Sequence, residues 1–221
     1  EGKYDAHALH NVLGSDVSGI VEAVGKDVKS IKVDDEVFGI TPNMLGAWAE
    51  YACAAEKDIF AKPANLTFEQ AAALPTGCIT ALGAVRKSNV KAGQQVLVYG
   101  ASGNVGQFAV QLSKAAGAIV TGVCSTRNIE MVKSIGADYA VDYKKKDFAV
   151  MDKKYDVIIA VNGYRTLSTY KNALTDNGTY IVIGGVKQAM LHAMGGPIRS
   201  IGSSKKMSSV IFAQIKDRGL D

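Results

Sequence analysis

The sequence is poor in cysteine, with three in 221 residues. Cys53, Cys78 and Cys124 lie far apart and show no paired spacing. This spacing excludes a disulfide framework and a zinc knuckle, because both need cysteines at short, repeated intervals. Few and unpaired cysteines are typical of a reducing compartment, and we expect the protein in the cytoplasm.

Long apolar runs and strong charge are also absent. No apolar stretch approaches the roughly 18 residues of a membrane helix, which argues against a membrane-spanning protein. The formal net charge of +4 is small for this length, and no basic run alternates with aromatics, so we expect no nucleic acid partner. The closest match to a basic run is Lys144–Lys146, which we interpret as a solvated loop or helix start. The chain starts at Glu1 with neither a signal peptide nor an initiator methionine, so we expect it to begin inside a longer protein.

Enough apolar residues are present to fill a core. The hydrophobic fraction is 48% and the charged fraction 21%, both ordinary for a globular protein. Up to Pro63, short alternating segments with frequent glycines predict strands near residues 19–25, 32–39 and 48–53. This pattern of short strands and frequent turns indicates an antiparallel, barrel-like region.

Two helices are expected next. Thr67, followed three residues later by Gln70, predicts a capped helix start. Pro75–Gly77 is expected to interrupt this helix before a second one at 79–88.

From Val90 onward, apolar segments alternate with helical ones. The expected strands are 95–100, 118–123, 139–142, 156–161 and 179–184, with 208–213 as a candidate sixth. The expected helices are 104–116, 128–136 and 166–174. Strands separated by such helices are typical of a doubly wound parallel sheet.

A glycine-rich loop follows the first of these strands, in the stretch VLVYGASGNVGQFAV (residues 96–110). Gly100, Gly103 and Gly106 stand between the strand and a helix that begins near Asn104. In the dinucleotide-binding fold these glycines allow a tight turn, the approach of a pyrophosphate and close helix–strand packing. A glycine triplet alone is weak evidence, but its place at the start of a βαβ series predicts dinucleotide binding.

The end of the second strand indicates which dinucleotide. An acid there binds the ribose hydroxyls of NAD, but this strand ends in Cys124-Ser125-Thr126-Arg127-Asn128, without a carboxylate. Small hydroxyls and a guanidinium suit a 2′-phosphate, which favours NADPH. The alternative interpretation is that Arg127 is a solvent-facing residue at a helix start.

Matching segments in family order resemble the medium-chain dehydrogenase/reductase superfamily, in particular its zinc-free quinone oxidoreductase-like branch. One departure is Asp34, where the family usually has glycine before the acidic pair. The segments are LGSDVSGIVEAVG (13–25), DEVFG (35–39), GAWAEY (46–51), AAALP (71–75), TA (80–81), the glycine loop (100–106), IGAD (135–138), VDY (141–143) and NGTYIVIGG (177–185).

The resemblance implies an α/β protein of two domains with the active site in the cleft between them. Residues 1–88 correspond to a GroES-like, β-rich catalytic domain with the linking helices, and 89–221 to a Rossmann NADP-binding domain. Family members have more chain before Leu13 and a C-terminal part that returns to the catalytic domain. We therefore expect a fragment or an incompletely represented chain.

The resemblance also implies that zinc is absent. The zinc branch has Gly-His-Glu where this chain has Gly14-Ser15-Asp16, and serine does not replace imidazole as a zinc ligand. Cys78 is out of register with the family's ligand cysteine, and the four-cysteine lobe is missing. We interpret His7 and His10 as a surface pair because no third ligand accompanies them.

These observations predict an NADPH-dependent oxidoreductase that transfers hydride to a quinone or an α,β-unsaturated carbonyl without zinc. Such acceptors delocalise the incoming charge, so a Lewis acid is not needed. The alternatives are a cofactor-binding structural or interaction module with little turnover, and a zinc-type alcohol dehydrogenase relative. A small-molecule substrate is expected as partner, and relatives are often homodimers joined edge to edge through their nucleotide sheets.

The resemblance also implies roles for single residues, although it identifies no proton donor. Tyr143 is expected at the adenosine phosphate end, with a partly buried strand-end aromatic as the alternative. Asn162 is expected near the nicotinamide, or as the cap of a turn. Ser15 and Asp16 are expected toward the substrate side, with a structural hydrogen-bond acceptor as the alternative that we favour for Asp16. The full set of expected cofactor-binding residues is Thr80, Gly100, Ala101, Ser102, Gly103, Asn104, Val105, Gly106, Ser125, Thr126, Arg127, Asn128, Tyr143, Val161, Asn162, Gly184 and Gly185.

Overall fold

The computed structural model describes residues 12–42, 45–161, 165–184 and 204–210. The chain divides into two compact units, a first unit of Glu1–Thr76 and a second unit of Gly77–Asp221. We predicted this division after residue 88, with the linking helices in the first domain. Helix α2 (Pro75–Ser88) instead packs its buried Ala81 and Ala84 into the core of the second unit.

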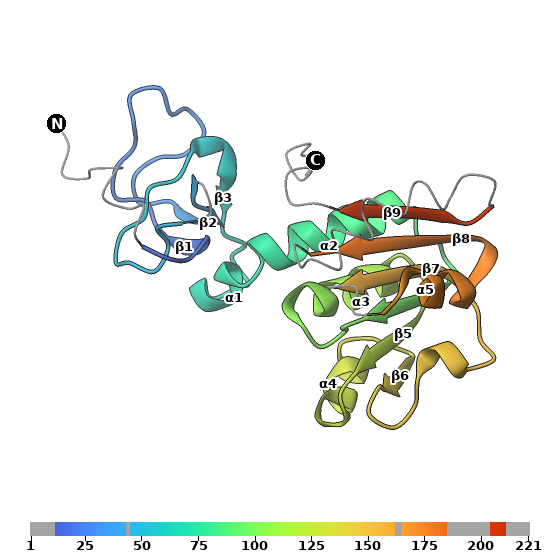
Figure 1. The fold of residues 1–221 in the computed structure, drawn as a ribbon. Coiled ribbons are helices and arrows are strands. Elements are labelled where there is room, and N and C mark those ends of the chain that lie inside the picture. The colour runs from blue at the N-terminus through green and yellow to red at the C-terminus, as the bar shows by residue number, and fades with distance from the viewer. Residues whose placement is uncertain (1–11, 43–44, 162–164, 185–203, 211–221) are drawn as a thin grey trace. The chain divides into compact units, whose positions relative to one another are not determined.

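The first unit contains a three-stranded antiparallel sheet (Figure 1). Its strands are β1 (Asp16–Ile20), β2 (Glu36–Ile40) and β3 (Ile59–Ala61), in that order across the sheet. A 3-10 turn, η3 (Glu56–Asp58), leads into β3.

The strand predicted at 48–53 is wrong. Residues 48–53 are all exposed, and Trp48 is 75% exposed, so the alternating pattern there has no buried face to stabilise a strand. Residues 46–48 are held instead by backbone hydrogen bonds to residues 12–14, such as Trp48 N to Leu13 O at 2.9 Å. The strand expected at 19–25 ends earlier, at Ile20.

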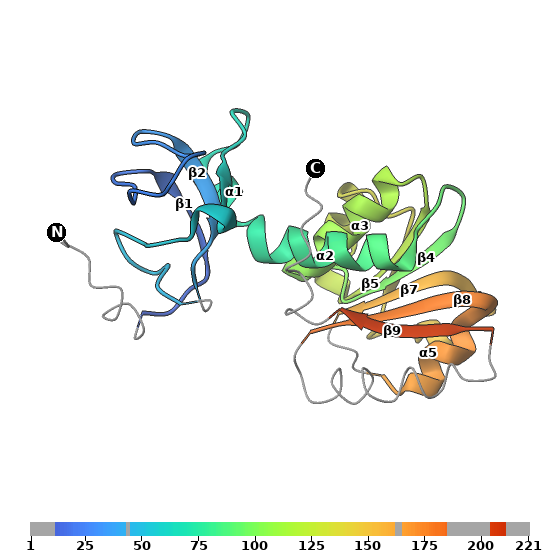
Figure 2. The same ribbon diagram turned by 90° about the horizontal axis from the view of Figure 1, so that it is seen from above.

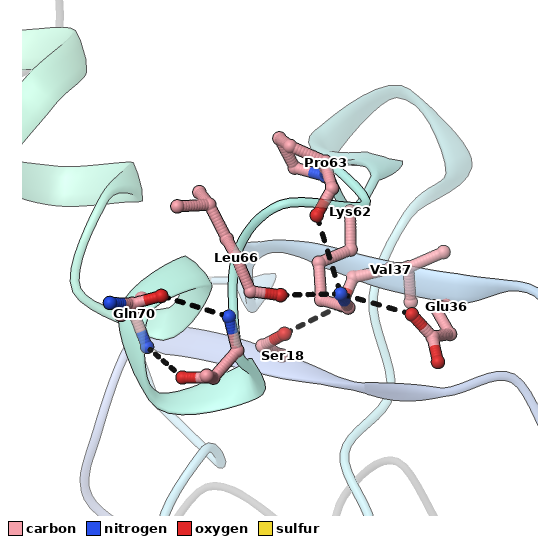
Figure 3. A network of polar contacts seen from close by, with 8 residues as sticks. Ser18, Glu36, Val37, Lys62, Pro63, Leu66 and Gln70 are labelled. Atoms are coloured by element: carbon pink, nitrogen blue, oxygen red, sulfur yellow. Dashed lines mark hydrogen bonds and ion pairs between the residues drawn. The ribbon is translucent and has the colours of Figure 1, made fainter.

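The predicted cap of the next helix, α1 (Phe68–Ala72), is confirmed. The backbone N–H of Gln70 donates to Thr67 Oγ1 at 3.2 Å, and the Gln70 side chain accepts from Thr67 N at 3.0 Å (Figure 3). This reciprocal pair satisfies two N–H groups that the first helical turn leaves free.

A buried lysine fixes the chain between β3 and α1. The side chain of Lys62 is only 6% exposed, and its ammonium lies 3.0 Å from Glu36 Oε2. The same ammonium donates to Leu66 O at 2.6 Å and to Pro63 O at 3.3 Å (Figure 3). It also lies over the Phe68 ring. A buried charge is tolerated only when it is paired and hydrogen-bonded, as it is here.

Replacing Lys62 with methionine is expected to destabilise the first unit by about 2 kcal/mol, because two carbonyls lose a charged donor. The free energy of unfolding is measured by denaturant titration followed by the fluorescence of Trp48, which is the only tryptophan. The exposed Lys57 provides the control, and Lys57→Met is expected to change little. An equal loss in both variants would contradict this role for Lys62.

The second unit is built on a six-stranded sheet in the order β6-β5-β4-β7-β8-β9, with every neighbouring pair parallel (Figure 1). The strands are β4 (Gln95–Tyr99), β5 (Ile119–Cys124), β6 (Tyr139–Asp142), β7 (Tyr155–Val161), β8 (Leu174–Ile183) and β9 (Lys206–Val210). The remaining helices and 3-10 turns are α3 (Asn104–Ala115), η4 (Thr126–Asn128), α4 (Ile129–Ser134), η5 (Phe148–Val150) and α5 (Leu167–Ala173). This confirms the predicted doubly wound fold, with the strand order reversing between β4 and β7.

Each face of this sheet carries its own core. Helices α2, α3 and α4 contribute to a cluster with Val96, Val98 and Ile181 on one face. Helix α5 covers the other face (Figure 2). On that face Tyr170 stacks on Tyr180 with ring centroids 4.8 Å apart. Burial raises the pKa of both tyrosines, so their hydroxyls stay neutral and the pair acts as core.

The two predicted helices are present, but the break between them falls at residues 73–74, and α2 begins at Pro75 rather than at residue 79. Proline suits the first turn of a helix, where its missing N–H is not needed. The strand predicted at 208–213 begins earlier, at Lys206, and its last three residues lie outside the described part. No helix in the described ranges combines the length and the apolar character needed to cross a bilayer.

Candidate functional site

The glycine loop joins β4 to α3 in a conformation that needs two of its glycines. Gly100 has a φ of +80°, a left-handed value that side chains disfavour. A Cβ added to Gly106 would overlap Gly100 O and come within 2.9 Å of the Ala101 Cα. Gly106 therefore allows α3 to lie directly against the turn, as the sequence predicted.

The start of α3 is open to a ligand. Gly103 is the N-cap, with φ −80°, and supplies no side chain to the first turn of this 12-residue helix. Among the described residues, a Cβ there would meet nothing closer than Gly100 O at 3.5 Å. The side chain of Gln107 stabilises the loop, because its Nε2 donates a hydrogen bond to Ser102 O at 3.2 Å. In the described part of the chain no side chain caps this helix. The N–H groups at the positive end of a helix fit an anion such as a diphosphate, so the residues present suit a dinucleotide.

The chain after β5 presents small polar groups and a cation. Ser125 is buried, and its Oγ accepts a hydrogen bond from Asn128 Nδ2 at 3.2 Å. Arg127 is exposed, and no hydrogen bond or ion pair to its guanidinium is found among the described residues. Burial raises the pKa of the Cys124 thiol, so this strand end carries no negative charge of its own.

The chain after β6 lies beside it. Cys124 and Asp142 are neighbours in register, and Tyr143 N donates to Cys124 O at 3.1 Å. Tyr143 is 49% exposed, directly after the strand. The Asp142 carboxylate accepts from Thr126 Oγ1 at 2.6 Å, and this bond lowers the pKa of Asp142. Asp142 is therefore ionised at neutral pH.

The topology brings most of the expected residues to one edge of the sheet. Val161 ends β7 and Gly184 follows β8, so both lie at the carboxyl edge with the glycine loop, Ser125–Asn128 and Tyr143. Ligands bind at this edge in open parallel sheets. The expected residues Asn162 and Gly185 lie outside the described residues.

Thr80 lies in α2 rather than at the strand ends. It is 4% exposed, and Oγ1 has no hydrogen-bond partner within the described part of the chain. Gly77, one helical turn earlier, lies against the start of α3, since a Cβ there would come within 2.6 Å of Asn104 Oδ1. Sequence reasoning gave no role to Gly77 or to Asp142.

In the first unit, Asp16 behaves as the structural acceptor we expected. Its Oδ1 accepts from Thr76 N at 2.9 Å and from Thr76 Oγ1 at 2.6 Å, near the start of α2. Within the described ranges, no three His, Cys, Asp or Glu side chains gather as metal ligands would. His7 and His10 lie outside those ranges.

Comparisons with known proteins agree with this architecture. Residues 104–215 match the zinc-binding dehydrogenase family, and residues 1–64 match the alcohol dehydrogenase GroES-like domain. The structure of the quinone oxidoreductase from Coxiella burnetii is similar with a TM-score of 0.81 and 29% identity, over 92% of this chain and 65% of that one. The Escherichia coli quinone oxidoreductase complexed with NADPH gives a TM-score of 0.74 and 26% identity, over 90% of this chain and 63% of that one.

Relatives of known name point the same way. The 2-methylene-furan-3-one reductase of Solanum lycopersicum is 39% identical over 71% of this chain and 43% of its own length. The NADPH-dependent alkenal/one oxidoreductase of Arabidopsis thaliana is 37% identical over 74% of this chain and 45% of its own. The chain thus spans about half the length of these relatives. Fold, motifs and relatives together confirm the predicted family: the chain belongs to the medium-chain dehydrogenase/reductase superfamily, in its quinone oxidoreductase-like branch.

Proposed function

We propose that the protein is an NADPH-dependent oxidoreductase that reduces a quinone or an α,β-unsaturated carbonyl without zinc. The observation that carries the proposal is the open start of α3 beyond a turn that needs Gly100 and Gly106. That arrangement suits the diphosphate of a dinucleotide. Relatives named for quinone and NADPH-dependent alkenal/one reduction support the same activity.

The strand ends support NADPH over NADH. The chain after β5 has no acid to accept the ribose hydroxyls, whereas Ser125 and the exposed Arg127 offer donors to an added phosphate. The half-exposed Tyr143 ring is available to the adenosine end. These residues bind and orient the cofactor, and Thr80, Val161 and Gly184 are proposed nearer the nicotinamide.

The proposed hydride transfer needs few catalytic groups from the protein. Bound NADPH supplies a hydride, and a quinone or enone accepts it by delocalising the charge. Ser15, where the zinc branch has a histidine, does not suit a metal site. The protein's task is then to hold the two reactants in contact, which itself lowers the barrier.

Assembly and location are part of the same proposal. In the described sheet β9 is the outermost strand, and its edge suits pairing with a second copy in a homodimer. The separate, free cysteines suit a reducing compartment such as the cytoplasm. Sedimentation equilibrium tests the first point and cell fractionation the second.

The test is a titration with NADPH and NADH, followed by cofactor oxidation with phenanthrenequinone as acceptor. We expect tighter binding of NADPH and quinone-dependent oxidation. Binding without any oxidation by quinones or enones would favour the alternative, a binding module with little turnover. Zinc in the purified protein at one equivalent would favour a zinc-type alcohol dehydrogenase.

Replacing Arg127 with aspartate is expected to raise the Kd for NADPH by about 10- to 100-fold, because a charged donor is lost and an anion is introduced. The Kd for NADH is expected to change far less. Calorimetry of both cofactors measures the ratio, with Glu130→Gln on the same surface as control. An unchanged NADPH preference would leave Arg127 as a solvent-facing residue.

A further inference from the structure

Asp142 connects the two loops that follow β5 and β6. One carboxylate oxygen accepts from Thr126 Oγ1 at 2.6 Å, and the other accepts from Lys144 N at 3.0 Å. Its backbone carbonyl accepts from the N–H groups of Lys145 and Lys146 at 3.0 and 2.9 Å. One residue thus fixes η4 on one side and the lysine turn on the other.

Thr126 and Ser125, in the loop after β5, use their hydroxyl groups in different hydrogen bonds. Since Asp142 is ionised, Thr126 must donate its only hydroxyl proton to the carboxylate. Ser125 Oγ instead accepts from Asn128 Nδ2, which leaves the Ser125 proton available to another acceptor. Of these two hydroxyls, Ser125 is therefore the donor that a ligand meets, and Thr126 serves to hold the loop.

The lysine turn adds positive charge at the same edge of the sheet. Lys144, Lys145 and Lys146 are exposed, and no side-chain bond to any of them is found within the described residues. Lys144 and Lys145 also lower the pKa of Asp142, so they offset its charge. Together with Arg127, these lysines place four exposed cations on the two loops that follow β5 and β6.

We propose that Asp142 is a positioning residue for the cofactor's 2′-phosphate, because it holds the Ser125–Arg127 loop and the Lys144–Lys146 turn in a fixed relation. The inference rests on the proposed function and assigns its cofactor preference to a residue that does not itself donate to the phosphate. Tight binding of an anion needs donors that are already in place, since ordering two loops on binding costs affinity.

A carboxylate near a phosphate site would also repel the ligand, and the two effects have opposite signs. The charge of Asp142 is exposed to water and accompanied by two lysines, which weakens repulsion. The loss of two hydrogen bonds frees two loops at once. The positioning effect is therefore expected to dominate.

The test compares adenosine 2′,5′-bisphosphate with adenosine 5′-monophosphate, which differ only in the 2′-phosphate. Asp142→Ala is expected to weaken calorimetric binding of the bisphosphate by about 10-fold, the equivalent of about 1.4 kcal/mol, and that of the monophosphate less than about 2-fold. Thr126→Val removes the hydroxyl that Asp142 holds but leaves the bond from Lys144 N, so we expect a loss no larger than that of Asp142→Ala. The double variant is expected to lose no more than Asp142→Ala alone, because that change already breaks the connection that Thr126→Val breaks.

Two controls accompany these variants. Thr126→Ser keeps the hydroxyl and is expected to bind as the unaltered protein does. Asp152 is exposed in the same unit, with no hydrogen bond or ion pair found within the described ranges, and Asp152→Asn is expected to change neither affinity.

Each other outcome has a defined meaning. Tighter bisphosphate binding by Asp142→Ala would show repulsion and overturn the proposal, as would additive losses or equal losses for both ligands. Discrimination between the ligands that persists in Asp142→Ala overturns the inference but leaves NADPH as the cofactor. Failure of the unaltered protein to discriminate refutes the proposed NADPH preference itself.

Discussion

Changing Gly106 to alanine is expected to abolish measurable NADPH binding. It is also expected to destabilise the second unit by about 3 kcal/mol, a typical cost of overpacking. The added methyl would overlap Gly100 O and crowd the Ala101 Cα at 2.9 Å. Both neighbours are backbone atoms, so no side chain can move aside. Helix α3 must shift away from the turn, which displaces the N–H groups proposed to hold the diphosphate. Calorimetry with NADPH and thermal unfolding measure the two effects.

Gly103→Ala is the matched control in the same loop. Gly103 has an ordinary φ of −80°, and its Cβ would meet no atom closer than 3.5 Å. We expect a loss of stability of no more than about 1 kcal/mol, the amount by which alanine is a poorer helix N-cap than glycine. NADPH binding is still expected to weaken, because the methyl occupies the approach to the helix. If Gly106→Ala binds NADPH as the unaltered protein does, the loop is not the diphosphate site.

The features that could be predicted from the sequence are those that neighbouring residues determine. The capping box of Thr67 and Gln70 depends on groups three residues apart, and it is present as expected. Strands β4 and β5 are continuous apolar runs between turns, a pattern typical of parallel strands that are buried on both faces of the sheet. The glycine loop combines both kinds of signal.

The errors come from contacts that no local pattern reveals. Alternation at 48–53 looks like a strand, but burial of one face decides whether it forms one, and neither face is buried. Helix α2 contains a proline and a glycine that look like a break, yet Pro75 merely starts it. Its membership of the second unit depends on packing against distant residues such as Val210.

The candidate site divides in the same way. The expected residues at the carboxyl edge follow from strand ends in a parallel sheet, which a sequence can indicate. The contact between Asp142 and Thr126 depends on the register of β5 against β6, and that of Gly77 with Asn104 on how α2 crosses α3. Such relations are set by three-dimensional packing. The only available signal was an acid between an apolar strand and three lysines.

Changing Gly39 to alanine is expected to abolish quinone reduction while binding of adenosine 2′,5′-bisphosphate stays within about 3-fold. Gly39 pairs with Ile59 between β2 and β3, and a Cβ would overlap Asp58 O and come within 2.9 Å of the Ile59 Cα. This overlap is expected to destabilise the first unit by about 2–3 kcal/mol, which is a typical cost of overpacking. The first unit, whose residues 1–64 match the GroES-like domain, then no longer contributes to turnover. Bisphosphate binding is kept because the proposed cofactor-binding residues lie in the second unit.

Gly19→Ala, in the neighbouring strand β1, makes the same chemical change in open space, with no atom of the described residues within 4 Å of the new Cβ. It is expected to keep turnover and to gain up to about 1 kcal/mol, because alanine restricts the unfolded chain more than glycine. Trp48 fluorescence reports unfolding of the first unit in both variants, and calorimetry reports the second. If Gly39→Ala loses bisphosphate binding as well, the two units do not fold independently. If Trp48 fluorescence shows the first unit unfolded while both activity and binding persist, the first unit has no part in the reaction.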